Sequence, residues 1–124
     1  MHVLATKWFK KWSKKANLKN QDLLKAVNNL EDGLSVADLG NHLFKIRVKR
    51  KHSGKSSGFR TIVVYRKGEK AIFLYGFGKN EKDNISDSEL NYFKTLGNDL
   101  LALNIDQLKQ LIEKSILFDI EVYE

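Results

Sequence analysis

The chain has 124 residues, and its 22 Lys and Arg against 15 Asp and Glu give a formal net charge of +7. A hydrophobic fraction of 42% at this length supports a packed core, so disorder is excluded and we expect one domain over residues 1–124. Cysteine is absent, which excludes disulfides and thiolate catalysis, and the three histidines lack the spacing of metal ligands. We therefore expect no metal and no other cofactor. No apolar run reaches membrane-spanning length, so we expect a cytoplasmic protein without a membrane partner.

The first third of the chain predicts two helices. Trp8 and Trp12 are four residues apart, and Phe9 widens the same apolar face. After a break at Asn17–Asn20, four apolar residues recur at helical spacing up to Gly33: Leu23, Leu24, Val27 and Leu30. We expect these helices to form a hairpin, preceded by a short edge strand around Val3 and Leu4.

The middle third changes to a period of two, which is typical of a half-buried strand. One side of this strand is apolar and the other carries cations, in the alternating run Phe44, Lys45, Ile46, Arg47, Val48 and Lys49. Two further strands are predicted from β-branched and aromatic residues, the last one apolar on both faces and therefore central. The result is an antiparallel meander of residues 44–49, 59–65 and 71–77, with a loop at 52–58 and a hairpin turn at 67–69.

The last third begins with a helix start, because Ser86 precedes Glu89 by the spacing of a capping box. A second, shorter helix is expected over Asp106–Ser115, and a short strand over Phe118–Tyr123 at the edge of the sheet. The predicted fold class is α+β: an N-terminal helical hairpin packed on one face of a small antiparallel meander sheet, followed by C-terminal helices.

Positive charge is concentrated between Leu43 and Lys82, where twelve Lys and Arg stand against two acids. The rest of the chain holds ten Lys and Arg and thirteen acids. A sheet that carries this much positive charge predicts a polyanionic partner, and nucleic acid is the first candidate.

The Gly54-Lys55-Ser56 tripeptide resembles part of a nucleotide-binding P-loop. That motif requires a glycine five positions before its Gly-Lys, where this chain has Lys49. A P-loop also leads into a helix, whereas the segment in this chain leads into a predicted strand. A nucleoside triphosphate site is therefore excluded. The segment is either a flexible polar loop or a basic flap in which Lys55 closes over a phosphate. His52 is either an ordinary loop residue or a catalytic base.

Arg60 stands in an otherwise apolar strand. It either pairs with Glu69 or Glu81, or presents its guanidinium fork to phosphate oxygens. Lys79 follows two glycines that permit the close approach of a ligand, and it is either a solvated residue or part of the same cationic site.

Five short segments carry the remaining information: Leu39-Gly40, Leu43-Phe44-Lys45-Ile46-Arg47, Gly54-Lys55-Ser56-Ser57-Gly58-Phe59-Arg60, Tyr75-Gly76-Phe77-Gly78-Lys79-Asn80-Glu81 and Asp83-Asn84-Ile85-Ser86. Together they resemble the HigB-like branch of the RelE/ParE superfamily, the toxins of bacterial type II toxin–antitoxin modules. The resemblance runs from about Thr6 to Glu121-Val122.

The resemblance implies a RelE-like microbial RNase fold and cleavage of mRNA, commonly in the ribosomal A site. It also implies a partner antitoxin, expected to be a helix-turn-helix DNA-binding protein. Some RelE relatives carry a tyrosine shortly after the last strand, where this chain reads Asp83-Asn84-Ile85-Ser86, so Tyr65 or Tyr75 would have to substitute.

The expected chemistry is metal-independent attack by the RNA 2′-hydroxyl, with protein cations stabilising the phosphorane. The general base is either a lysine whose pKa is lowered by neighbouring cations, or Glu81. The expected catalytic residues are Arg60, Lys79, Lys45, Arg47 and Glu81. The expected RNA-binding residues are Lys49, Lys55, Arg66, Tyr65 and Tyr75.

Two other functions remain open on the same fold. One is a ParE-like inhibitor of DNA gyrase, since fold alone does not decide function within this superfamily. The other is a non-catalytic RNA-binding module built from the basic face and its aromatic neighbours.

Overall fold

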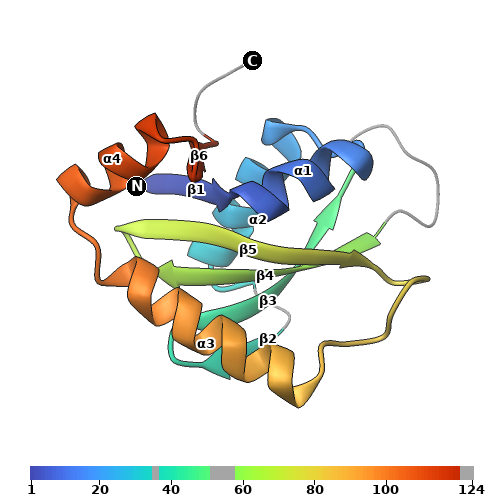
Figure 1. Cartoon of the computed structure of the whole chain (residues 1–124). Helices are drawn as coiled ribbons and strands as arrows, with labels where there is room; N and C mark the ends of the chain where they lie inside the picture. Colours follow the sequence, from blue (N-terminus) through green and yellow to red (C-terminus); the bar gives the residue numbers. More distant parts are fainter. Residues whose placement is uncertain (35–36, 51–57, 121–124) are drawn as a thin grey trace.

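The computed structural model describes residues 1–34, 37–50 and 58–120, which contain six strands and four helices (Figure 1). No helix in these residues is long and apolar enough to cross a membrane. The elements in chain order are β1 (His2–Thr6), α1 (Lys7–Lys15), α2 (Asn20–Glu31), β2 (Ala37–Gly40), β3 (Leu43–Lys49), β4 (Gly58–Arg66), β5 (Lys70–Gly78), α3 (Asp87–Leu101), α4 (Ile105–Glu113) and β6 (Leu117–Asp119).

All six strands join one sheet in the order β2-β3-β4-β5-β1-β6. The predicted antiparallel meander is confirmed as β3, β4 and β5. The predicted strand around Val3 and Leu4 is present as β1, so the fold does not begin with the helical hairpin, and the expectation that this strand lies at an edge is wrong, because β1 lies inside the sheet. It pairs in parallel with β5 on one side and antiparallel with β6 on the other. The helical pair of α1 and α2 follows it.

Helices cover both faces of the sheet, and not one face as predicted (Figure 1). The α1/α2 face holds a buried cluster around Phe9, Leu23 and Phe73, whereas the α3 face holds a second cluster around Ile72 and Phe93. Because β5 is buried on both faces, its apolar sequence is that of a central strand, as predicted.

The connection between β1 and α1 has no loop. The Thr6 hydroxyl accepts a hydrogen bond from the Phe9 N–H at 3.2 Å and caps the helix. The pairing of β1 with β5 ends at Phe73, so α1 lies against the part of β5 beyond that point. Trp12 packs directly on Gly76, where a Cβ atom would lie 2.2 Å from the indole ring. The glycine therefore sets how closely α1 approaches the sheet.

The predicted start of α3 is confirmed. The Ser86 hydroxyl accepts from the Glu89 N–H at 3.1 Å, and the Glu89 carboxylate accepts from the Ser86 N–H at 2.8 Å. Further along, α3 crosses β4 at Gly97, where an added Cβ would lie 2.9 Å from Val64 Cγ2. The capping box and this close crossing hold α3 across the sheet.

The C-terminal part of the chain closes the sheet. The predicted short helix is present as α4, and the predicted edge strand is present as β6, although it begins one residue earlier. Residues 121–124 of the predicted strand lie outside the described part of the chain. Lys70, at the start of β5, is buried and donates to the carbonyl oxygens of Leu101 and Leu103 at 3.2 and 2.7 Å. This contact ties the end of α3 to the sheet.

Candidate active site

Two arginines lie opposite each other on the α3 face of the sheet. Arg47 of β3 pairs in register with Arg60 of β4, and Phe77 of β5 is the next residue in the same row. Paired residues on neighbouring antiparallel strands have Cβ atoms about 4.5–5.5 Å apart. Like charges directly opposite each other on neighbouring strands disfavour the folded state, and a bound anion would relieve this repulsion.

The described surroundings of the two guanidinium groups contain no carboxylate partner. Gly58 has no side chain, and a Cβ there would lie 2.9 Å from Arg47 Nε, so the Arg47 side chain lies over this glycine. Arg60 Nη1 is buried and has no hydrogen-bond partner among the residues that the structure describes. Within the same residues, neither arginine forms an ion pair with a carboxylate. The alternative in which Arg60 pairs with Glu69 or Glu81 is therefore not observed.

Lys45 adds a third cation to this face. It stands two residues before Arg47 on β3, so its side chain leaves the sheet on the same side. Its ammonium donates to Asn84 Oδ1 at 3.4 Å, which brings the segment between β5 and α3 over the strand. Lys45 thus joins Arg47 and Arg60 on this face.

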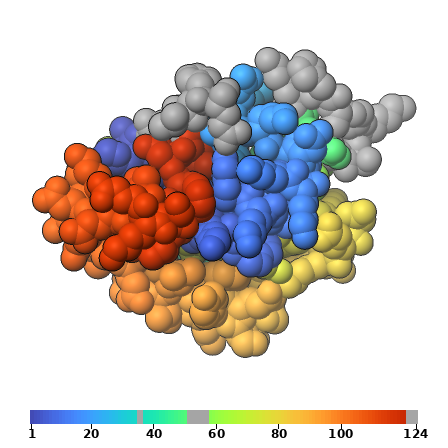
Figure 2. Space-filling view, turned by 45° about the horizontal axis from the view of Figure 1, so that its top comes forward, coloured from blue at the N-terminus to red at the C-terminus, as the bar shows by residue number. Residues whose placement is uncertain are grey.

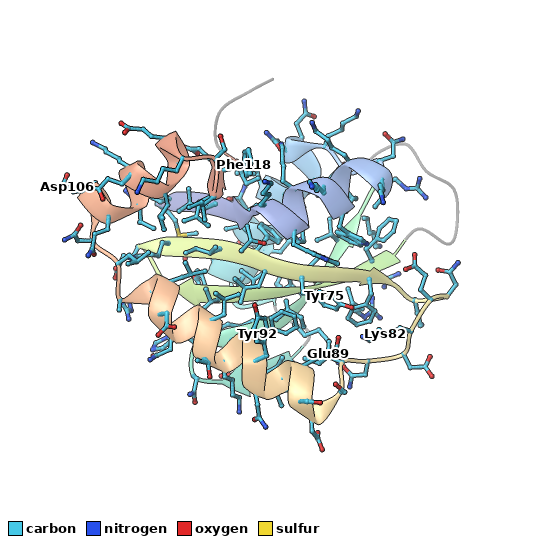
Figure 3. The ribbon with its side chains drawn as sticks, in the orientation of Figure 1. Tyr75, Lys82, Glu89, Tyr92, Asp106 and Phe118 are labelled. Atoms are coloured by element: carbon cyan, nitrogen blue, oxygen red, sulfur yellow. The ribbon has the colours of Figure 1, made fainter. Side chains whose placement is uncertain are left out.

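A tyrosine, a lysine and a glutamate lie beside these cations, between β5 and the first turn of α3 (Figure 3). Tyr75 pairs with Ile62, which is two residues after Arg60 on β4 and therefore on the same face of the sheet. The Lys82 ammonium donates to the Tyr75 hydroxyl at 3.2 Å and to both oxygens of Glu89 at 2.8 Å. The hydrogen bond to Glu89, followed by that to Tyr75, raises the pKa of Lys82. Lys82 is therefore a stable cation that orients the tyrosine hydroxyl.

The ring of Tyr75 is held between two other rings. Trp8 of α1 stacks on it with centroids 4.7 Å apart, and Phe93 of α3 lies 5.0 Å away on an inclined plane. Lys82 also lies 5.2 Å from the centroid of the tyrosine ring, within the range of a cation–π contact. With both its ring and its hydroxyl in contact, Tyr75 has a defined orientation on this face.

Lys79 and Glu81 do not join the paired arginines. They line a hollow of about 610 Å³ at the end of the sheet, together with Lys15 of α1 and Phe59. Asn80 Oδ1 and Glu81 Oε1 lie 2.8 and 3.2 Å from where a Cβ of Gly78 would be. Phe59 and its partner Gly78 face α1, so the hollow opens towards α1, and Gly58, which Arg47 covers, lies at its border. The expected convergence of all the cations in a single pocket is not observed.

The predicted RNA-binding residues are spread over the sheet. Arg66 is at the opposite end of β4 and pairs with Glu69 at 3.2 Å. Tyr65 faces α2, where its hydroxyl donates to Glu31; burial, followed by this hydrogen bond, raises the pKa of the phenol. Lys49 lines a hollow between α2 and β3 next to Arg47. Lys55 and His52 lie outside the described residues.

Two features of the site are not predicted by the sequence. The contact between Lys82 and Tyr75 spans a turn, and the contact between Trp8 and Tyr75 joins distant parts of the chain. The local signal for the first contact is Glu89: its carboxylate in a capping box favours a basic partner nearby, and Lys82 is the nearest preceding lysine. No group of metal-binding side chains occurs in residues 1–34, 37–50 and 58–120.

Comparison with known proteins provides the family. A search of curated proteins found no match. The family model for the RelE toxin of the RelE/RelB toxin–antitoxin system matches residues 1–120, which is nearly the whole chain. The arrangement of strands and helices fits this family, although its order differs from the predicted one. The chain therefore belongs to the RelE toxin family of toxin–antitoxin systems.

Proposed function

We propose that this toxin is an endoribonuclease that stops translation by cutting mRNA, and that it cuts mRNA while the message is on the ribosome. The observation that carries the proposal is the pair formed by Arg47 and Arg60, two guanidinium groups in register without a carboxylate partner among the described residues. The buried Nη1 of Arg60 lacks a hydrogen-bond acceptor within the described chain. A phosphodiester bound on this face would neutralise the pair.

The reaction uses the RNA's own nucleophile. The 2′-oxygen attacks the adjacent phosphorus, the bond from phosphorus to the 5′-oxygen breaks, and the products are a 2′,3′-cyclic phosphate and a 5′-hydroxyl. Negative charge increases on the equatorial phosphoryl oxygens in the transition state, and Arg47 and Arg60 are in place to stabilise it. Lys45 would hold a neighbouring phosphate. This route requires no metal from the protein.

The proton transfer to the leaving group is assigned to the second group of residues. The proton of the 2′-hydroxyl passes to a water molecule in the site, and another proton must reach the 5′-oxygen. The Tyr75 hydroxyl oxygen accepts a hydrogen bond from Lys82, so the hydroxyl proton points away from Lys82. This proton can therefore be donated to the leaving 5′-oxygen. The cationic Lys82 stabilises the phenolate that results. Lys79 and Glu81 remain candidates for contacts with RNA that crosses the end of the sheet.

Within the RelE family we assign the chain to the HigB-like branch, on the basis of its Gly-Lys-Ser-x-Gly-Phe-Arg and Gly-Lys-Asn-Glu segments. We infer that its antitoxin is a small helix-turn-helix protein encoded in the neighbouring reading frame. A reading frame of that kind beside this one would support the assignment.

The test is brief induction of the toxin followed by mapping of new RNA 5′ ends. Wild-type protein should produce new RNA ends within coding regions. Arg60→Ala should raise the activation free energy of the chemical step by roughly 2–4 kcal/mol, as for the loss of one oxyanion donor. Arg66→Ala is the matched control, because it changes the same residue type in the same strand at a position already paired with Glu69. It should cut normally.

Four results would count against all or part of the proposal. Growth arrest without new RNA ends would favour inhibition of gyrase, and RNA binding without cutting would favour a non-catalytic module. Normal cutting by folded Arg60→Ala would remove the assigned role of that residue. Equal cutting of free and translating mRNA in vitro would contradict the ribosome-dependent part alone.

A further inference from the structure

Trp8 is a large aromatic side chain that is only partly buried by packing within the chain. One side of the ring stacks on Tyr75, yet 48% of the residue remains exposed. It is also nearly parallel to Trp12, with ring centroids 6.4 Å apart and planes inclined by 10°. Two indoles thus lie along the edge of β5 beyond the end of β1, and the outer one is open to solvent.

Basic residues surround this ring. The nine residues of α1 include five lysines and no acid. Helical spacing places Lys11 and Lys15 on the same side of α1 as Trp8, along about 10 Å of the helix axis. Figure 2 shows α1, in blue, next to the yellow segment that follows β5. We call Trp8, Lys11 and Lys15 the α1 stripe.

The α1 stripe connects two regions that already carry cations. At one end, Trp8 stacks on Tyr75, whose hydroxyl contacts Lys82 on the α3 face. At the other end, Lys15 lines the hollow that also contains Lys79. A chain of phosphates that leaves the paired arginines around this edge of β5 would therefore meet an exposed ring and then further lysines.

We propose that the α1 stripe is a second binding site for single-stranded RNA, in which a nucleobase stacks on Trp8 while Lys11 and Lys15 neutralise the flanking phosphates. The proposal rests on the proposed function, because it takes the strand to be the one bound at the arginines. An open aromatic face, followed along the same side of the helix by two lysines and with no acid on that helix, is the composition of a stacking platform for single strands. The platform accepts any base, so it would add affinity without sequence preference.

The experiment measures binding separately from cutting. A fluorescently labelled RNA oligonucleotide with 2′-O-methyl groups lacks the attacking hydroxyl, and its anisotropy reports binding to the full-length toxin at several salt concentrations. Trp8→Ala should weaken binding by about tenfold, and Trp8→Phe should restore most of it because a ring remains. Lys11→Gln and Lys15→Gln should each lower the slope of log K against log salt by about 0.7.

Tyr92→Ala is the matched control. Tyr92 is also an exposed aromatic residue, 62% accessible, but it lies on α3 outside the α1 stripe, so its removal should leave the RNA affinity unchanged. A second readout follows Trp8 directly. In a Trp12→Phe background Trp8 is the only tryptophan, and its fluorescence should be quenched when the RNA binds.

The outcomes separate this proposal from the nuclease itself. Unchanged affinity and salt slope in the variants would overturn the α1 stripe, whether or not the toxin cuts RNA. If Trp8→Ala spares RNA binding and instead weakens capture by the antitoxin, the surface is a protein-docking site and the proposal is wrong. Binding that depends on Trp8 without any cutting of unmodified RNA would contradict the nuclease and leave the α1 stripe supported. If Trp8→Ala does not fold, the two lysine variants and Trp8→Phe decide the question.

Discussion

Lys82 holds the carboxylate of Glu89 at the N-terminus of α3. Its ammonium lies 2.8 Å from each carboxylate oxygen, and one of these oxygens also accepts the Ser86 N–H of the capping box. The same glutamate therefore closes the start of the helix and positions the lysine that contacts Tyr75. A helix cap and a candidate catalytic group depend on one side chain.

Acid should weaken the protein through this pair. The hydrogen bond from Lys82, followed by that from the Ser86 N–H, lowers the pKa of Glu89 to about 2. The unfolded value is about 4.3, so the contribution to stability is complete above that pH and is lost as the pH falls towards 2. Urea unfolding between pH 2 and 6 should show a stability difference between wild type and Glu89→Gln that shrinks on acidification. A stability difference that stays constant with pH would contradict a stabilising contact between the ionised Glu89 and Lys82.

Tyr75→Phe should separate the hydroxyl from the ring. The aromatic stack with Trp8 and Phe93 is kept, so the free energy of unfolding should change little. Cleavage should slow by about a hundredfold if the hydroxyl donates the proton to the leaving oxygen. Single-turnover cutting of a model message measures this, with Tyr92→Phe as the control. An unchanged rate would remove Tyr75 from the proton transfer.

Lys70→Met should destabilise the fold without touching the proposed site. The Lys70 ammonium donates to two carbonyl oxygens at the end of α3 and lies 3.7 Å from Glu69. Its loss leaves those carbonyls without their donor, at a cost of about 2–3 kcal/mol. Lys67→Met, a change of the same type at an exposed position in the adjacent turn, should cost almost nothing. Equal urea midpoints for the two variants would show that the buried contact contributes little.

Gly97→Ala tests the crossing of α3 and β4. A methyl group here would lie 2.9 Å from Val64 Cγ2 and 3.1 Å from Val64 Cβ. Overpacking costs about 1–3 kcal/mol, which outweighs the gain of up to about 1 kcal/mol from better helix propensity. Thermal unfolding should show a lower Tm, and the double variant with Val64→Ala should be less destabilised than the sum of the two single variants. A higher Tm for Gly97→Ala would mean that α3 can shift freely.

Local patterns predicted the elements well. The alternation from Phe44 to Lys49 placed the cations of β3 on one face, and the Ser86/Glu89 spacing placed the start of α3. The positions of Lys45, Arg47 and Arg60 on the α3 face also follow from strand parity and the meander. These predictions succeed because each depends on backbone periodicity within a few residues or on pairing between consecutive strands.

Long-range arrangement was predicted poorly. Nothing near Val3 indicates that β1 pairs with β5, because a parallel neighbour leaves no turn signal between the two strands. The position of Lys79 failed for a different reason: strand parity ends where β5 ends, and the turn that follows directs Glu81 to the α1 side. Parity therefore fixes side chains inside strands but not in the turns where several of the predicted site residues lie.

The place of β1 in the sheet has a consequence for synthesis of the toxin. Its first strand leaves the ribosome early but cannot pair until β5 and then β6 have been translated. The six-stranded sheet is therefore complete only after β6 has joined, and until then the edge strand of the β3-β4-β5 meander lacks its parallel neighbour. A chain shortened before β6 would leave β1 with an open edge and expose apolar surface that the complete sheet buries.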